Sequence, residues 1–149
     1  MDIREITESE LPDLLALYQH LHASDEPLPE SAVVDEAWGK INSSDTLRYF
    51  GLYDSNRLVS SCTMSIIPNL TRGCRPYGVI ENVVTHGEFR RKGYGRAVLQ
   101  HALAHAWYVG CYKVMLLTGR MDDSTHSFYE SAGFERGKKQ AFVARPSNA

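Results

Sequence analysis

Residues 90 to 107 combine a cluster of basic residues and two glycines with a run of apolar residues at helical spacing. Gly93 and Gly95 carry no Cβ, so the backbone can turn tightly there and approach a ligand closely. The first N–H groups of the following helix lack internal partners, and the helix dipole favours an anion at that end. Four basic side chains add positive charge around the same point: Arg90, Arg91, Lys92 and Arg96. The segment predicts either a phosphate-binding loop or a plain strand-to-helix turn.

Two common phosphate-binding motifs do not fit this loop. The Walker A string G-x-x-x-x-G-K-[ST] occurs nowhere in the chain. The dinucleotide fingerprint G-x-G-x-x-G fails because Val98 stands at the third glycine. The acidic residue expected about 20 residues further on is also missing, since only Lys113 and apolar neighbours lie there. The motif that remains is R-x-x-G-x-G, from Arg90 to Gly95, directly after an expected strand.

The composition is that of an ordinary globular protein. The chain has 149 residues, 43% of them hydrophobic and 23% charged, so we expect one domain over residues 1–149. A net charge of -2 argues against a nucleic-acid partner, and no apolar run reaches the roughly 18 residues of a membrane span. Three widely spaced cysteines (Cys62, Cys74 and Cys111) suit reduced thiols, and the polar N-terminus is unlike a signal peptide. We therefore expect a cytoplasmic protein with no membrane partner.

Strands and helices alternate along the chain, which predicts an α/β fold. The predicted strands are residues 2–6, 46–54, 57–67, 77–86 and 113–119, with one or two closing strands in 134–145. The predicted helices are residues 7–21, 31–41, 94–107 and 123–133. The first helix is expected to place on one face Leu11, Leu14, Leu15, Tyr18 and Leu21. Pairing residues 79–86 with 113–118 gives a central parallel βαβ unit in a mixed, mostly antiparallel sheet flanked by helices.

The phosphate loop and the segments after it resemble a known family. The string "VVTHGEFRRKGYGRAVLQHAL", residues 83–103, resembles the acetyl-CoA pyrophosphate loop of the GNAT superfamily of N-acetyltransferases. The strings "GCYKVMLL" and "SFYESAGF" resemble that superfamily's next strand and the helix that follows it. The strings "IENVVT" and "CYKV" are similar to glucosamine-6-phosphate N-acetyltransferases in particular. The resemblance covers nearly the whole chain and implies a GNAT-type sheet whose βαβ unit binds acetyl-CoA.

The resemblance also implies which residues bind the cofactor. Backbone amides of the loop hold the CoA pyrophosphate, and the loop residues are Arg90, Arg91, Lys92, Gly93, Tyr94, Gly95 and Arg96. Backbone groups of Val83, Val84 and Thr85 pair with the pantetheine arm as though it were another strand. The family often has an asparagine near the position of Asp122 or Thr125, so whether either residue contacts CoA stays open.

Glu81 is the candidate general base. A lysine-like amine with a pKa of about 10.4 is mostly protonated at pH 7, and its neutral form costs about 4.6 kcal/mol, so attack on a thioester needs a proton acceptor. Glu81 and Asn82 interrupt both faces of the apolar strand "GVIENVV", which indicates a polar cavity there. A structural carboxylate paired with a cation is the alternative. In the same scheme a backbone N–H of Val83 or Val84 polarises the thioester carbonyl.

Tyr129 is the candidate general acid. A thiol pKa of about 8.5 means that an unprotonated CoA thiolate costs only about 2 kcal/mol at pH 7, so a proton donor is helpful but secondary. Tyr129 matches the family tyrosine that protonates the leaving sulfur, and a packed tyrosine with a satisfied hydroxyl is the alternative. A non-catalytic acyl-CoA-binding module, the second function class, would need neither Tyr129 nor Glu81. We therefore predict an N-acetyltransferase that moves an acetyl group from acetyl-CoA to a primary amine by direct attack in a ternary complex.

Other polar residues have less specific interpretations. His101 and His105 have the spacing of a zinc pair, but the glutamate of H-E-x-x-H and a third ligand are missing, so we expect no metal. His86 and His126 lie at the ends of the relevant strand and helix, where either could face the acceptor. Cys111 is expected to pack in the core rather than to act as a nucleophile.

The acceptor is predicted to be a small-molecule or peptide amine, and in the family it lies between the first two helices and the closing hairpin. Residues 21–37 carry five carboxylates and no Lys or Arg, which favours a polyamine, an aminoglycoside or a lysine side chain. A solvated acidic loop is the alternative. A sugar phosphate requires basic residues, which Arg48, Arg72 and Arg75 could supply. We also expect a homodimer, because superfamily members often form one and closing strands in 134–145 leave an exposed sheet edge.

Overall fold

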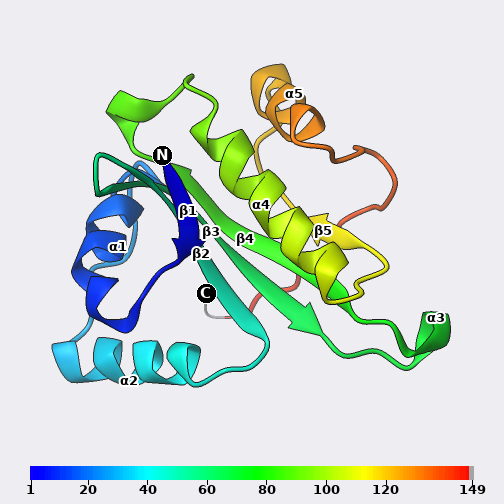
Figure 1. The fold of residues 1–149 in the computed structure, drawn as a ribbon, viewed down its shortest axis with the longest axis horizontal. Coiled ribbons are helices and arrows are strands. Elements are labelled where there is room, and N and C mark those ends of the chain that lie inside the picture. Colours follow the sequence, from blue (N-terminus) through cyan, green and yellow to red (C-terminus); the bar gives the residue numbers. More distant parts are fainter. Residues whose placement is uncertain (148–149) are drawn as a thin grey trace.

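The computed structural model describes residues 1–147 and contains a five-stranded sheet (Figure 1). Its strands are β1 (Asp2–Glu5), β2 (Leu47–Asp54), β3 (Arg57–Ile67), β4 (Tyr77–Thr85) and β5 (Val114–Leu116). They lie in sequence order across the sheet, antiparallel from β1 to β4 and parallel between β4 and β5. The mixed α/β fold with a parallel βαβ unit, expected from the sequence, is confirmed.

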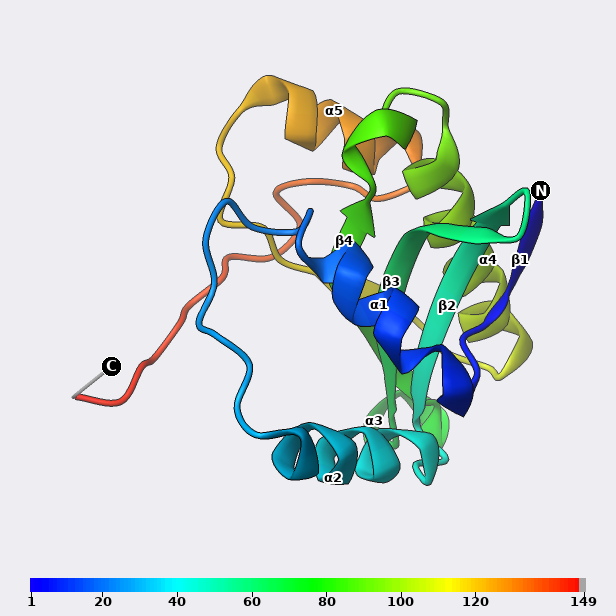
Figure 2. The ribbon, with the colours of Figure 1, turned by 90° about the vertical axis from the view of Figure 1, so that its left-hand side faces the viewer.

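Helices cover both faces of the sheet. One face carries α1 (Leu11–Tyr18) and α2 (Ser31–Asn42), and the other carries α4 (Tyr94–Tyr108) with α5 (Asp123–Ser131) beside it (Figures 1 and 2). Short 3₁₀ turns precede α1 and α4, namely η1 (Glu8–Glu10) and η2 (Gly87–Phe89), and α3 (Thr71–Cys74) lies at the tip of the β3–β4 connection. Within residues 1–147, no helix is both long enough and apolar enough to cross a membrane.

Each face of the sheet has its own core. Toward α4, the strands bury Phe50, Leu52, Val59, Cys62, Met64 and Ile80 against Val98, Leu99, Ala102 and Ala106. Toward α1 and α2, the core consists of Ile6, Leu14, Leu17, Trp38, Tyr53, Leu58 and Val84. The buried face of α1 is centred on Leu14 and Leu17, whereas the sequence pattern had placed Leu15 on it instead of Leu17. The predicted helix at 7–21 is in fact a 3₁₀ turn followed by the shorter α1.

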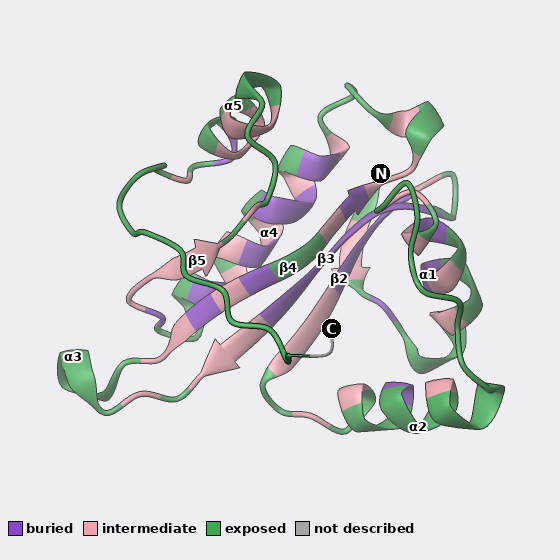
Figure 3. Ribbon diagram, turned by 180° about the vertical axis from the view of Figure 1, so that it is seen from behind, coloured by how far each residue is buried: buried purple, intermediate pink, exposed green. Residues whose placement is uncertain are grey.

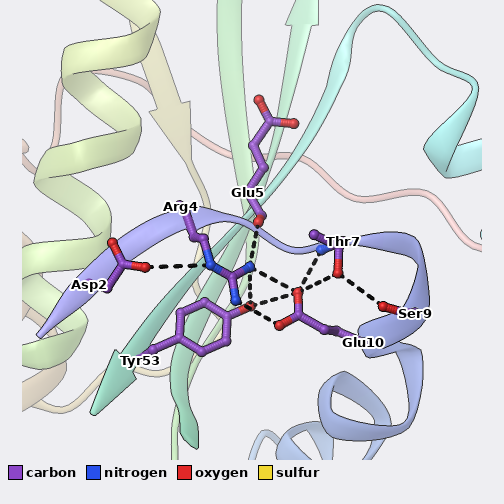
Figure 4. Close-up of polar contacts among 7 residues, drawn as sticks. All are labelled: Asp2, Arg4, Glu5, Thr7, Ser9, Glu10 and Tyr53. Carbon is purple, nitrogen blue, oxygen red and sulfur yellow. Dashed lines mark hydrogen bonds and ion pairs between the residues drawn. The ribbon is translucent and has the colours of Figure 1, made fainter. Parts of the chain in front are cut away.

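An ion pair between β1 and the turn before α1 fixes this helix over the sheet (Figure 4). Arg4 donates to both carboxylate oxygens of Glu10, at 2.9 and 2.8 Å. Glu10 also accepts from the backbone N–H of Thr7 at 2.7 Å and from the hydroxyl of Tyr53 at 3.1 Å. The bond from Arg4 holds the pKa of Glu10 far below its usual range, and burial raises the pKa of Tyr53 to about 12. The network therefore ties β1, β2 and the start of α1 together.

The strand β4 contains one residue more than its partner between two neighbouring pairs. Thr63 faces Glu81 and Ser61 faces Val84, so one residue of β3 but two of β4 lie between these pairs. Asn82, the first of the two, has a φ of 52°, in the left-handed region that a β-bulge often uses. The bulge shifts the side-chain alternation, so Ile80 packs toward α4 whereas Val84 packs toward α1.

The predicted closing strands in residues 134–145 are wrong. Residues 135–147 join no strand of the described chain, and they extend as a mostly exposed tail on the face of α1 and α2 (Figures 2 and 3). Phe142 and Val143 are 90% and 70% exposed in this tail. A strand needs a partner edge, and β5, the neighbouring edge strand, pairs over three residues only. The strand predicted at 113–119 is accordingly shorter than expected and half-buried.

Candidate active site

Glu81 lies at the bulge of β4 on the face covered by α1 and α2. Its side chain is exposed, and it stands directly across from Thr63 on β3. Within residues 1–147, Glu81 takes part in no ion pair, although seven pairs join other residues. The structural alternative, a carboxylate neutralised by a neighbouring cation, therefore lacks its cation. A carboxylate of this kind is available to accept a proton from a bound amine.

Three hydroxyl groups lie on the same face close to the bulge, and sequence patterns did not single them out. Ser61 and Thr63 are buried on β3, and their hydroxyls have no hydrogen-bond partner in the described chain. The hydroxyl of Tyr18, from the last turn of α1, is also buried without a partner. Burial raises the pKa of Tyr18 to about 12, an effect that the nearby side chains of Thr63 and Asn82 partly offset. The signal available in the sequence was the run of small polar residues in β3, which includes Ser61 and Thr63.

Tyr129 lies on α5, half-buried between the rings of Phe128 and Phe134. Burial raises its pKa, the charge of Arg120 lowers it and the charge of Glu81 raises it, so both charges act on the phenol. Among the described residues, the hydroxyl of Tyr129 has no hydrogen-bond partner, so its role as proton donor or as packing residue stays a prediction. The phenol stays protonated at neutral pH, which is what a proton donor requires.

Asp122 and Thr125 form hydrogen bonds with each other at the start of α5. The carboxylate of Asp122 accepts from the backbone N–H of Thr125 at 2.9 Å and from its hydroxyl at 2.8 Å. These bonds lower the pKa of Asp122 and cap the helix that carries Tyr129. Both side chains therefore position α5.

The loop before α4 presents free backbone amides. Arg91 and Gly93 adopt left-handed conformations with φ of 63° and 82°, and Gly93 is the N-cap of α4. None of the hydrogen bonds of the described chain uses a backbone N–H of residues 91–96. Alternating left-handed and right-handed residues that direct several N–H groups outward form an anion-binding concavity, here at a helix N-terminus.

Gly95 is required by packing in the first turn of α4. A Cβ at this position would lie 3.0 Å from the ring of Phe128 and 3.1 Å from the hydroxyl of Thr85. Glycine at this point therefore lets α4 approach both β4 and α5. Two side chains of the loop contact other parts of the chain and so stabilise its conformation. The hydroxyl of Tyr94 donates to Asp54 at 2.5 Å, and the Lys92 ammonium lies 4.7 Å from the ring centre of Phe89.

Beyond Ile80, β4 has a free edge on the side of β5. The parallel pairing runs only from Gly78 to Ile80, so Val83 and Thr85 have no partner in β5. β5 ends at Leu116, whereas β4 continues to Thr85. Val83, Val84 and Thr85 are thus brought beside the loop by the fold, next to an edge that an extended ligand can pair with.

The histidines singled out in the sequence lie in three different parts of the fold. His101 and His105 pack edge-on against Phe50. His126 bonds the backbone of Arg120 on the α5 side, whereas His86 lies at the loop end of β4. The described residues contain no group of three or more His, Cys, Asp or Glu that could hold a metal. Burial raises the pKa of the Cys111 thiol, which packs in the core as expected.

The basic residues considered for a sugar phosphate lie away from the bulge. Arg48 pairs with Glu5 at 3.4 Å. Arg72 and Arg75 are at the tip of the β3–β4 connection, where both guanidinium groups lie over the ring of Tyr112. None of the three is part of the group of residues around Glu81.

Comparison with known proteins matches this arrangement to one family. The sequence profile of the Acetyltransferase (GNAT) family matches residues 5–134. The chain belongs to the GNAT acetyltransferase family. A glucosamine 6-phosphate N-acetyltransferase of Trypanosoma brucei brucei is 32% identical over 142 residues, which are 94% of this chain and 92% of that protein. As expected from the sequence, this GNAT enzyme is an acyl-CoA-dependent N-acetyltransferase, and enzymes of the family use acetyl-CoA as co-substrate.

Solved structures agree with the fold. A protein of Agrobacterium tumefaciens str. C58, described as an acetyltransferase, has a TM-score of 0.90 and 41% identity, over 97% of this chain and 100% of that one. The glucosamine-6-phosphate N-acetyltransferase of Arabidopsis thaliana has a TM-score of 0.81 at 22% identity, over 98% of this chain and 97% of that one. The second likeness concerns the fold alone.

Gly93→Asp is expected to abolish acetyl-CoA binding while costing only about 1 kcal/mol of folding stability. A Cβ at Gly93 meets no atom within 4 Å, so left-handed strain is the main cost to folding, whereas the carboxylate repels a pyrophosphate. Gly110, at the other end of α4, has a φ of 88° and equally open surroundings, so Gly110→Asp is the matched control. Acetyl-CoA should raise the melting temperature of the wild type and of Gly110→Asp but not of Gly93→Asp. An equal rise with ATP or NAD would contradict the assignment of the loop.

Proposed function

We propose that this GNAT enzyme acetylates a primary amine by direct attack on acetyl-CoA within a ternary complex. The observation that carries the proposal is Glu81, an exposed carboxylate without a cation partner, at a bulge beside the open edge of β4. Glu81 directly follows Ile80, the last residue of β4 that pairs with β5, so its carboxylate lies where the sheet opens. A role as proton acceptor beside the thioester of bound acetyl-CoA would explain a carboxylate at this position of β4.

The cofactor is proposed to bind along the loop and the free edge. The backbone N–H groups of residues 91–96 would hold the pyrophosphate. The side chain of Arg90 would stabilise the loop through its hydrogen bond to the carbonyl of Thr85. Val83, Val84 and Thr85 would pair with the pantetheine arm. A backbone N–H of Val83 or Val84 would then donate to the thioester oxygen as it gains negative charge.

The transfer is proposed to proceed in four chemical steps. Glu81 accepts a proton from the ammonium, directly or through water. The neutral nitrogen attacks the thioester carbon, and a tetrahedral intermediate forms with its oxyanion at the backbone N–H. The C–S bond then breaks, and the electron pair leaves on sulfur. Tyr129 donates its proton to that thiolate, and the resulting tyrosinate takes the second proton from the acetylated nitrogen, directly or through water. The products are a neutral amide and a neutral thiol, and Glu81 releases its proton to solvent.

The first acceptor to test is an amino sugar phosphate of the glucosamine 6-phosphate class. The relative from Trypanosoma brucei brucei supports it, and the hydroxyl groups of Tyr18, Ser61 and Thr63 near Glu81 suit a hydroxylated amine. Its phosphate would have to be bound without Arg48, Arg72 and Arg75, which lie elsewhere. A cationic acceptor such as a polyamine is the second candidate. It is supported by exposed carboxylates in the connection from α1 to α2, among them Asp25 and Glu26.

We also propose that residues 1–149 act as one domain in a cytoplasmic homodimer. The three unpaired cysteines support a reducing compartment. The extended tail supports dimerisation, since Phe142 and Val143 are exposed and β5 offers an unpaired edge. A second copy of the chain could cover both.

The dimer is expected to depend on the tail. Phe142→Asp combined with Val143→Asp should convert a dimeric mass to a monomeric one in light scattering at micromolar concentration. Leu70→Asp is the control, because Leu70 is also 90% exposed but lies at the tip of the β3–β4 connection. A monomeric wild type would reject the proposal, and so would a double variant that stays dimeric.

Substitution of Tyr129 is expected to lower kcat, whereas substitution of Glu81 is expected to change the pH dependence of the reaction. Tyr129→Phe keeps the ring and removes the proton donor, so the thiolate penalty of about 2 kcal/mol limits the loss in kcat to about 30-fold. Glu81→Gln removes the proton acceptor, so its activity should recover as pH rises and the amine deprotonates unaided. The wild type should therefore show the ascending limb of kcat/KM at lower pH than Glu81→Gln.

Rates of thiol release with acetyl-CoA and glucosamine 6-phosphate between pH 6 and 10 test both roles. Because burial raises the pKa of Tyr129, the wild type should not lose its proton donor within the neutral range. Identical pH profiles for the wild type and Glu81→Gln would reduce Glu81 to a structural carboxylate. An undiminished rate in Tyr129→Phe would make the tyrosine a packing residue.

A further inference from the structure

Helix α1 is joined to the phosphate loop at a junction formed by two histidines and an arginine. The imidazole rings of His20, just after α1, and His86, just after β4, lie 3.9 Å apart between their centres. The backbone N–H of Gly87 donates to Nδ1 of His20 at 3.2 Å. The guanidinium of Arg90 donates to the carbonyl of His20 at 2.9 Å and to that of Thr85 at 3.3 Å.

The contacts of His86 keep the junction in one arrangement. Its Nδ1 accepts from the backbone N–H of Glu88 at 3.2 Å, and its Nε2 lies 2.8 Å from a guanidinium nitrogen of Arg57. Burial, followed by the charges of His20 and Arg57, lowers the pKa of His86. The rings of His86 and His20 are in tilted contact, and the junction links α1, the β2–β3 turn and the loop.

The last turn of α1 also reaches the other half of the site. Tyr18 lies two residues before His20, and its buried hydroxyl is near Thr63 and Asn82 at the bulge. The chain that follows, residues 22–30, contains no helix or strand and is exposed. The position of this one turn therefore affects both the loop, through His20, and the surroundings of Glu81, through Tyr18.

We propose that His20 and Arg90 are positioning residues that couple occupation of the phosphate loop to the acceptor side of the site through the last turn of α1. This inference rests on the proposed binding of CoA at the loop. A pyrophosphate held by the loop amides fixes the loop backbone from Arg90 onward. Arg90 and Gly87 then hold His20, and the last turn of α1 keeps Tyr18 at the bulge. CoA thereby orders the acceptor side before the amine binds, and by linkage the amine favours CoA binding equally.

Hydrogen–deuterium exchange on the full chain, with and without CoA, tests the coupling without any acceptor. The amides of His20 and Leu21 donate to the carbonyls of Leu17 and Tyr18, so their exchange reports on the last turn of α1. In the wild type, CoA should slow exchange in the loop and slow these two amides by about fivefold or more. In His20→Ala, and in Arg90→Met at a CoA concentration that saturates its weakened loop, CoA should still slow exchange in the loop. It should no longer slow exchange of the amides at position 20 and at Leu21.

Two further variants separate coupling from simple loss of structure. The side-chain oxygen of His20→Asn can accept the N–H of Gly87, so this variant should keep the response of α1 to CoA. His22→Ala, at an exposed position in the same segment, should behave as the wild type. The inference is overturned if the last turn of α1 does not respond to CoA in the wild type, or responds equally in Arg90→Met. If CoA slows exchange nowhere, the proposed function fails and the inference fails with it.

Discussion

The extra residue in β4 at Asn82 is the constraint on which the rest of the site depends. Without it, side chains would alternate regularly along β4, and Ile80 and Val84 would enter the same core. With it, Ile80 packs toward α4 and Val84 toward α1. The left-handed φ of 52° at Asn82 is the local cost, and a stable pairing of β4 with β3 on both sides of the bulge compensates it. The same irregularity leaves Glu81 exposed, next to the part of the β4 edge that does not pair with β5.

The loop before α4 keeps its shape through contacts of its side chains with the rest of the chain. Arg90, Tyr94 and Lys92 bind a carbonyl, a carboxylate and an aromatic ring, respectively. Their contacts hold the loop backbone in a shape that leaves a row of amide groups free. Amides fixed in this way need little reorganisation when an anion arrives, which is why a rigid loop favours binding.

Local sequence patterns predicted the parts of the protein that local physics determines. Glycines before an apolar helical pattern predicted the turn into α4, and alternation predicted β2 and β3 with their tight turn. The polar cavity expected at Glu81 and Asn82 stays a prediction, and nothing in the string "IENVV" reveals which residue takes the left-handed conformation. That choice depends on the register with β3.

Tertiary contacts explain what the sequence could not predict. His20 and Arg90 are 70 residues apart, and Tyr18 looked like one more member of an apolar helix face. The tail around Phe142 has the composition of a strand, but strand formation needs cross-strand partners, and β5 offers only three paired residues. The predicted closing strands failed for that reason.

Initial velocities of thiol release, with acetyl-CoA and glucosamine 6-phosphate both varied, test direct transfer most directly. The account predicts reciprocal plots that intersect, and no release above background in the absence of an amine. A covalent acetyl-enzyme is not expected, since burial raises the pKa of Cys62 to about 12 and also raises that of Cys111. Parallel reciprocal plots would indicate such an intermediate and would contradict direct attack in a ternary complex.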